Sequence, residues 1–168
     1  LSGSGNFIYG YGFGGSGWGD NDHTTWSSKG IIDVTDNSIL ITSPTYLGQG
    51  GEDILLVKAD VNTGQIIWSK TYGGTGSDQS RDIVIHNDGY TFVGNTNSFP
   101  VSTSQQPSLT ENMAERDILL VNVDHNGDLL WARTYGGDNR DKGIGVKTSI
   151  DGGFTMSAYS NSTFFGNG

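Results

Sequence analysis

The chain reads Asp53-Ile-Leu-Leu-Val57 and then Trp68-Ser-Lys-Thr-Tyr-Gly-Gly74. About 63 residues later it repeats both stretches as Asp117-Ile-Leu-Leu-Val121 and Trp131-Ala-Arg-Thr-Tyr-Gly-Gly137. A fixed period of this size indicates copies of one supersecondary unit, each too small to bury a core alone. The repeat therefore predicts the architecture of the chain, while it says little about what the chain binds.

Short runs of alternating apolar and polar residues are separated by turn-forming residues. Asn87-Asp-Gly89 and Asp151-Gly-Gly153 lie between such runs and predict hairpins, because Gly, Asn and Asp tolerate positive φ. A second hairpin in each unit turns through Asp60-Val-Asn-Thr-Gly64 or Asp124-His-Asn-Gly127. No window has a 3.6-residue period, so we expect an all-β chain with little or no helix. The expected strands are residues 29–34, 38–43, 53–60, 64–71, 81–86, 90–95, 117–124, 128–134, 143–148 and 153–159.

Four antiparallel strands in each unit are typical of the blades of a β-propeller, which needs about four to eight blades to close. The expected organisation is 1–28 as the last strand of a preceding blade plus a connection, 29–74 as a blade, 75–137 as a blade with a long 96–116 loop, and 138–168 as the first half of a further blade. We therefore expect an incomplete propeller segment that is poorly soluble or oligomeric when expressed alone.

The connection between the second and third strands differs most between units. It has nine residues in the first unit, 44–52, and 21 residues in the second, 96–116, where Pro, Ser, Thr and Gln are frequent. Long loops of this kind carry function or are inert insertions, and both interpretations stay open. We expect the longer loop to be an exposed excursion without a core of its own.

The hairpins at Asp60 and Asp124 are each followed by a Gly and a Trp at nearly the same spacing. This pattern resembles the tryptophan-docking repeat of quinoprotein-type propellers, in which a Trp on the outer strand packs against the neighbouring blade. The resemblance implies that the two Trp residues are largely buried and equivalent, since large aromatics bury about 150–250 Å² each. The expected docking residues are Trp68, Trp131, Tyr9, Asp60, Gly64, Asp124, Gly127, Tyr72 and Tyr135.

The fuller pattern adds the Thr-Tyr-Gly-Gly and Asp-Gly-Tyr/Phe elements to the Trp repeat. It is similar to the β-propeller repeats of large secreted and cell-surface proteins of Bacteroidetes-type bacteria, and the similarity spans residues 6–168. The resemblance implies a surface or adhesion module of a bacterial protein. In that family such modules are often exported through a C-terminal sorting domain, and we expect no such domain within these 168 residues.

Composition narrows the classes of partner. The net charge of −9 and the pI of about 4.4 argue against nucleic acids and anionic membranes. The absence of cysteine excludes disulfides and thiolate metal sites. No apolar run approaches the roughly 18 residues of a membrane-spanning segment, so we expect no membrane insertion.

Sites for metals and catalysis are poorly supported. Asp124, Asn126 and Asp128 offer oxygens at alternate positions, as a calcium loop does, but no closing Glu follows at the required spacing. Turn formation is therefore the preferred interpretation, and we expect no cofactor. His23, His86 and His125 share no spacing, and no carboxylate pair is marked among Asp33, Asp82 and Asp117, which could face a central channel.

These observations favour a non-enzymatic binding, adhesion or scaffold module of a larger secreted bacterial surface protein. Its expected partners are the rest of its own chain or sister blades, with a carbohydrate or protein ligand at the surface. The alternatives are a fragment of a quinoprotein-like propeller enzyme and a purely structural assembly component. The absorbance of a bound quinone would distinguish the enzyme from the binding module.

Overall fold

The described part of the chain consists of eleven strands joined by turns, with no helix. The computed structural model describes residues 29–48, 50–98 and 116–163, together with the backbone of 165–167. The strands are β1 (Lys29–Asp33), β2 (Ser38–Thr45), β3 (Asp53–Asp60), β4 (Ile66–Tyr72), β5 (Asp78–His86), β6 (Gly89–Thr96), β7 (Asp117–Val123), β8 (Leu129–Gly137), β9 (Asp141–Thr148), β10 (Phe154–Ser160) and β11 (Phe165–Asn167). The predicted all-β class is confirmed. Each of the ten strands expected between 29 and 159 is present, with ends displaced by a few residues.

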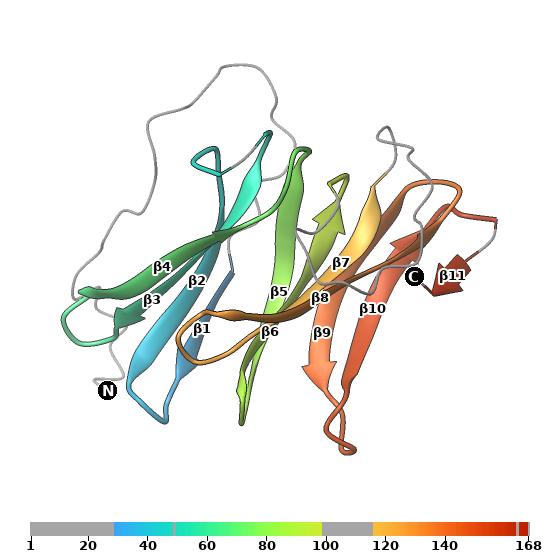
Figure 1. The fold of residues 1–168 in the computed structure, drawn as a ribbon. Helices are drawn as coiled ribbons and strands as arrows, with labels where there is room; N and C mark the ends of the chain where they lie inside the picture. The colour runs from blue at the N-terminus through green and yellow to red at the C-terminus, as the bar shows by residue number, and fades with distance from the viewer. Residues whose placement is uncertain (1–28, 49, 99–115, 164, 168) are drawn as a thin grey trace, which may run out of the picture.

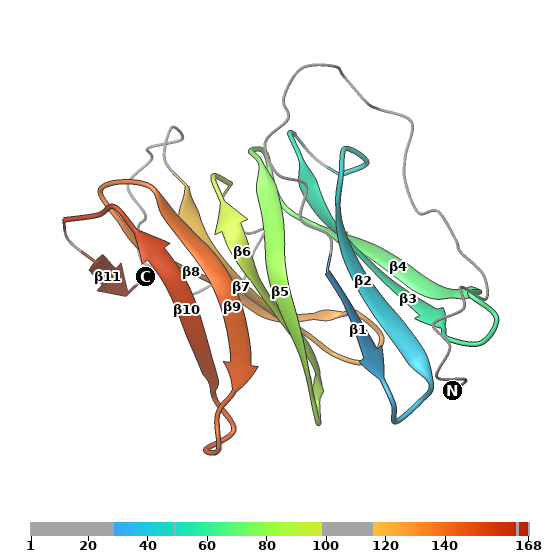
Figure 2. The ribbon, with the colours of Figure 1, turned by 180° about the vertical axis from the view of Figure 1, so that it is seen from behind.

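The strands form three antiparallel sheets that follow one another along the chain. Sheet 1 has the order β1-β2-β3-β4, sheet 2 has the order β5-β6-β7-β8 with β11 added outside β8, and sheet 3 is the pair β9-β10. The first strands of successive sheets pack together, β1 on β5 and β5 on β9. Figure 1 shows the sheets side by side with β4 and β8 nearest the viewer, and Figure 2 shows the opposite side. Within the described residues the sheets do not close into a ring.

The strand β11 was not foreseen from the sequence. Its backbone pairs with the end of β8, with Phe165 opposite Gly137 and Asn167 opposite Tyr135. From the sequence, residues 138–168 are expected to contribute only to a further unit, whereas these three residues return to the sheet before it. Three residues without a hydrophobic alternation carry no strand signal of their own, because the neighbouring strand supplies the pairing partners.

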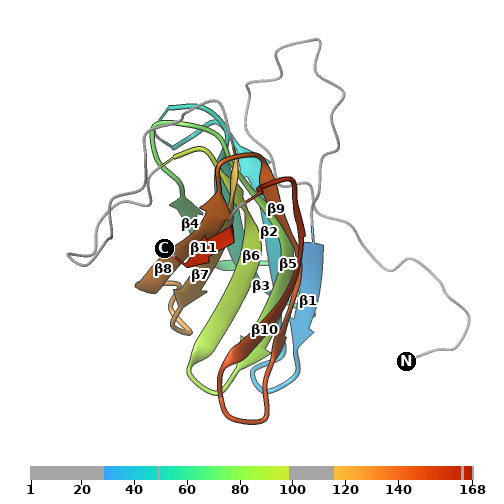
Figure 3. The ribbon, with the colours of Figure 1, turned by 90° about the vertical axis from the view of Figure 1, so that its right-hand side faces the viewer.

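The hydrophobic core lies in two layers between sheets, which we call the first seam (sheet 1 against sheet 2) and the second seam (sheet 2 against sheet 3). Figure 3 views this stack from the side of sheet 3. The buried side chains of the first seam are Leu40, Ile54, Leu56, Ile83, Tyr90, Phe92, Leu119, Val121 and Val123, and those of the second are Val93, Ile118, Leu120 and Val146. Alternate residues of β7 serve the two seams, because successive side chains of a strand point to opposite faces.

A β-bulge interrupts the pairing of β5 with β6. The register shifts between Ser80 and Asp82, which leaves Arg81 without a partner in β6. Gly94 lies under the bulge, and a Cβ atom there would come within 1.7 Å of the Gln79 carbonyl oxygen. Glycine is required at this point, and the bulge turns Arg81 out of the regular alternation.

Two expectations fall outside the described residues. One is the strand and connection expected in residues 1–28, which include the expected docking residue Tyr9. The other is the exposed 96–116 loop, of which residues 99–115 are not described. They stay predictions from the sequence.

Candidate functional site

The last strand of sheet 1 docks on the turn between β7 and β8. Trp68 on β4 donates a hydrogen bond from Nε1 to the carbonyl oxygen of His125 at 3.1 Å. Its ring centroid lies 6.3 Å from that of Tyr90. Four residues further along β4, the Tyr72 hydroxyl donates to the Gly127 carbonyl oxygen at 2.6 Å. Two of the docking residues expected from the sequence thus bind one turn of the next sheet.

Charged groups surround this contact. Lys70, between Trp68 and Tyr72 on β4, forms an ion pair with Asp128 on the same turn. Burial raises the pKa of Tyr72 well above its ordinary value, and the negative charges of Asp128 and Asp124 add to the effect. The Tyr72 phenol is therefore neutral at physiological pH and serves as a hydrogen-bond donor.

The second seam repeats the aromatic part of this contact. Trp131 on β8 lies 5.9 Å from Phe154 on β10, measured between ring centroids, and the Arg133 guanidinium lies 5.2 Å over the Trp131 ring. Tyr135 packs against the apolar residues of the same seam. Both indoles are partly buried, because β4 is the outer strand of sheet 1 and β11 pairs only with the end of β8, beyond Trp131. Trp68 and Trp131 thus occupy matching positions in successive sheets.

The Asp and Gly residues of the predicted turns shape those turns. Asp60 Oδ1 accepts from the amides of Asn62 and Thr63 at 2.9 and 2.8 Å. Asp124 Oδ1 accepts from the amides of Asn126 and Asp128, both at 2.8 Å. These backbone hydrogen bonds lower the pKa of both carboxyls. The glycines that complete the two turns, Gly64 and Gly127, have φ angles of 68° and 76°.

An open cavity of about 400 Å³ lies at the outer end of the first seam. Tyr72 and Lys70 of β4 form one wall, and the apolar side chains of β7 and β8 form the other. Asp53 and Asp78, each only 1% exposed, contribute to its lining. Apolar walls with a few polar groups are the usual surroundings of a small bound molecule. Sequence reasoning missed this cavity, because it forms only when two sheets stack.

A buried acid recurs where β5 and β9 begin. Asp78 Oδ2 accepts from the Gly74 amide at 3.0 Å and from Ser98 Oγ at 2.7 Å. In the next repeat, Asp141 Oδ2 accepts from the Gly137 amide at 3.0 Å and from Ser162 Oγ at 2.8 Å. Each acid ties the Gly-Gly segment to the end of the following hairpin. The sequence signal for this arrangement is the Asp that lies four residues after each Thr-Tyr-Gly-Gly.

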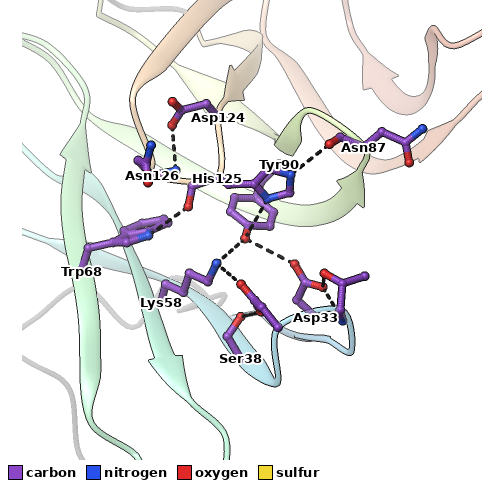
Figure 4. A network of polar contacts seen from close by, with 11 residues as sticks. Asp33, Ser38, Lys58, Trp68, Asn87, Tyr90, Asp124, His125 and Asn126 are labelled. Carbon is purple, nitrogen blue, oxygen red and sulfur yellow. Dashed lines mark hydrogen bonds and ion pairs between the residues drawn. The ribbon is translucent and has the colours of Figure 1, made fainter.

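A polar network crosses the first seam at the edge formed by the β1–β2, β5–β6 and β7–β8 turns (Figure 4). Lys58, whose side chain is 7% exposed, pairs with Asp36 and donates from Nζ to the Tyr90 hydroxyl at 2.9 Å. The Tyr90 hydroxyl in turn donates to Asp33 Oδ2 at 3.3 Å and lies 3.3 Å from His125 Nδ1. Tyr90 is fully buried, so its hydroxyl is closed to a ligand. The network therefore serves to hold the sheets together, although the sequence offered only one sign of it, a charged residue within the apolar run 54–59.

His86 lies in the second seam, apart from His125. Its ring packs edge-on against Phe154 at 5.3 Å between centroids, and its Nε2 lies 3.0 Å from Asn122 Nδ2 and 3.1 Å from Thr91 Oγ1. Burial lowers the pKa of His86, although the negative charge of Asp88 opposes the shift. Protonation of this ring therefore disfavours the folded state.

We expect an acid-sensitive stability that depends on His86. Its folded pKa is below the unfolded value of about 6.5, so its contribution is complete above that pH and is lost as the pH falls through the folded pKa. Urea unfolding at pH 8, 7, 6 and 5 should show a falling free energy of unfolding in the acidic part of this series. The fall should be shallower in His86→Gln than in the unaltered chain. Equal slopes in His86→Gln and the unaltered chain would contradict the assignment.

Among the described residues, no three carboxylate, imidazole or thiol groups converge as a metal site requires. In the turn whose alternating oxygens resemble a calcium loop, the Asp124 carboxylate accepts from backbone amides and the Asp128 carboxylate pairs with Lys70. Asp33 belongs to the Tyr90 network, and Asp82 accepts from the Val146 amide at 3.1 Å. Asp33 and Asp82 therefore have separate structural surroundings.

No protein-family model matches the chain, and no curated protein is matched by it. The described residues include no helix with the length and apolarity needed to cross a lipid bilayer. The geometry of the seams is therefore the basis for a functional proposal.

Proposed function

We propose that this chain is a segment of a β-propeller and acts as a non-catalytic binding, adhesion or scaffold module of a larger secreted bacterial surface protein. The observation that carries the proposal is the repeated docking of Trp68 and Trp131 from the outer strand of one sheet onto the next. Stacking of four-stranded sheets with their first strands together is the arrangement of propeller blades. The bacterial surface setting rests on the resemblance of the repeats.

The polar groups of the seams support a module without catalysis. Lys58 and Tyr90 are buried in a closed network, and Asp78 and Asp141 are bound to backbone amides and serine hydroxyls. Groups held in this way stabilise the stacking of sheets and are not directed at a reacting atom. The open cavity of the first seam gives the module a concave place for a ligand.

Binding by the full-length protein tests this proposal. We expect saturable binding to at least one member of a panel of immobilised glycans and extracellular proteins, with no absorbance band in the visible and no turnover of the ligand. The double variant Trp68→Ala/Trp131→Ala loses both docking contacts and serves as the control for binding that needs stacked sheets. A visible quinone band would favour the enzyme alternative. Failure to bind any member, in a protein that still assembles normally, would favour the purely structural one.

A further inference from the structure

The edge of the molecule where β5 and β9 begin carries the same backbone hydrogen bonds in both seams. The Asp78 amide donates to the Glu52 carbonyl oxygen at 2.5 Å, and the Asp141 amide donates to the Arg116 carbonyl oxygen at 2.6 Å. The Asn97 amide donates to the Ser77 carbonyl oxygen at 3.2 Å, and the Asn161 amide donates to the Arg140 carbonyl oxygen at 3.1 Å. Glu52 thus corresponds to Arg116, Ser77 corresponds to Arg140, and Gln79, which follows Asp78, corresponds to Lys142.

The side chains at these matched positions differ in charge. In the first seam, Gln79 Nε2 donates to Glu52 Oε2 at 2.6 Å. The interacting side chains there are a neutral amide and a carboxylate. In the second seam, all three positions are basic: Arg116, Arg140 and Lys142. Because the backbone hydrogen bonds are the same in both seams, the fold does not require basic residues at these three positions.

A fourth cation joins them from the bulge of β5. Arg116 Nη1 donates to Gln79 Oε1 at 2.9 Å, and Arg81 Nη2 lies 3.5 Å from the same oxygen. The two guanidinium groups are therefore neighbours. We call Arg81, Arg116, Arg140 and Lys142 the basic cluster. It holds four of the nine Lys and Arg residues of a chain whose net charge is −9.

The cluster is not neutralised by ion pairs within the described part of the chain. Lys29, Lys58 and Lys70 each pair with an Asp, whereas no member of the basic cluster pairs with a described carboxylate. Burial and the charges of Arg140 and Arg81 lower the pKa of Arg116, although Glu52 and Asp78 oppose the shift. The pKa of Lys142 is lowered first by Arg140. The members of the cluster repel one another.

The nearby carboxylates form hydrogen bonds with groups outside the basic cluster. Asp78 and Asp141 point to the opposite face of their strands from Gln79 and Lys142, and each is bound by a glycine amide and a serine hydroxyl. Glu52 is bound by Gln79. Arg140 is exposed and the other three cluster members are partly buried, so the cluster is accessible from solvent.

We propose that the basic cluster binds a compact phosphate-type dianion, either free phosphate or the terminal phosphate of a small phosphomonoester. Adjacent guanidinium groups offer paired N–H donors that match the oxygens of a tetrahedral oxyanion. A dianion also relieves more of the mutual repulsion than a carboxylate does. The overall negative charge disfavours long polyanions such as nucleic acids, which would meet repulsion beyond the cluster. The proposal goes beyond the binding module proposed above, because it adds a site with its own ligand class.

Equilibrium dialysis of radiolabelled inorganic phosphate against the full chain tests the site, and the method is insensitive to self-association. At low ionic strength we expect saturable binding at one site per chain, weakened about tenfold or more in Arg81→Gln/Arg116→Gln. The matched double variant Lys29→Gln/Lys147→Gln removes the same two positive charges outside the cluster and should bind within about twofold of the unaltered chain. Circular dichroism checks that each variant is folded.

Competing ligands identify the source of the phosphate. Glucose 6-phosphate displaces the label if the site accepts phosphomonoesters, and fails to displace it if only free phosphate fits. Unlabelled sulfate should compete more weakly than phosphate at pH 8, and acetate at matched ionic strength should not compete. No saturable phosphate binding, or equal losses in the cluster and control variants, would overturn the proposal. Binding to glycans or proteins that persists in Arg81→Gln/Arg116→Gln would leave the proposed module intact, so the two proposals fail separately.

Discussion

Replacing Trp68 by alanine is expected to lower the free energy of unfolding by about 3 kcal/mol, the lower end of the range for buried large aromatics. The indole packs against Tyr90 at 6.3 Å and donates to the His125 carbonyl oxygen at 3.1 Å. Its removal leaves a gap at the outer end of the first seam and a carbonyl without its partner. Partial burial of the ring places the effect at the lower end.

Urea unfolding followed by far-ultraviolet circular dichroism measures this effect. Trp68→Phe is the intermediate control, because it keeps an aromatic ring in the seam but loses the indole N–H and part of the ring surface, so it should cost less than Trp68→Ala. A change below about 1 kcal/mol in Trp68→Ala would show that the docking contact contributes little to stability.

The strands were predictable from the sequence because their signals are local. Asn87-Asp-Gly89 and Asp151-Gly-Gly153 mark hairpins by the backbone angles that these residues tolerate, and both hairpins are present. The start of β5 was placed at 81 and lies at Asp78, because Asp78, Gln79 and Ser80 lack the apolar alternation that reveals a strand. Here the buried carboxylate of Asp78 takes the place of an apolar side chain.

The candidate sites were less predictable, since they depend on contacts between sheets. The Trp spacing indicated which residues dock, but it could not identify Gly127 as the surface on which Trp68 rests. Lys58 and Tyr90 are far apart in the sequence and meet only across the first seam. The basic cluster is recognised only by comparing the two seams, in which the carbonyl groups of Glu52 and Arg116 accept equivalent backbone hydrogen bonds. In the sequence alone, each arginine is an ordinary polar residue.

Replacing Gly127 by alanine is the second large effect that we expect, again about 3 kcal/mol. The φ angle of Gly127 is 76°, and a side chain in this left-handed region costs about 1–2 kcal/mol. A Cβ atom would also lie 2.9 Å from Trp68 Cζ3 and 3.2 Å from Lys70 Cδ. Such overpacking adds about 1–3 kcal/mol, because the indole must move away from the turn.

Gly152 separates these two contributions. Its φ angle is 83°, yet no atom lies within 4 Å of a Cβ built there. Gly152→Ala should therefore carry only the conformational cost, about 1–2 kcal/mol, and the excess in Gly127→Ala measures the contact with Trp68. A double-mutant cycle sharpens the test, because Gly127→Ala should lose that excess in the Trp68→Ala background. If the two substitutions were simply additive, Gly127 would be a turn residue only, and close packing of the indole on this turn would have no energetic role in joining the sheets.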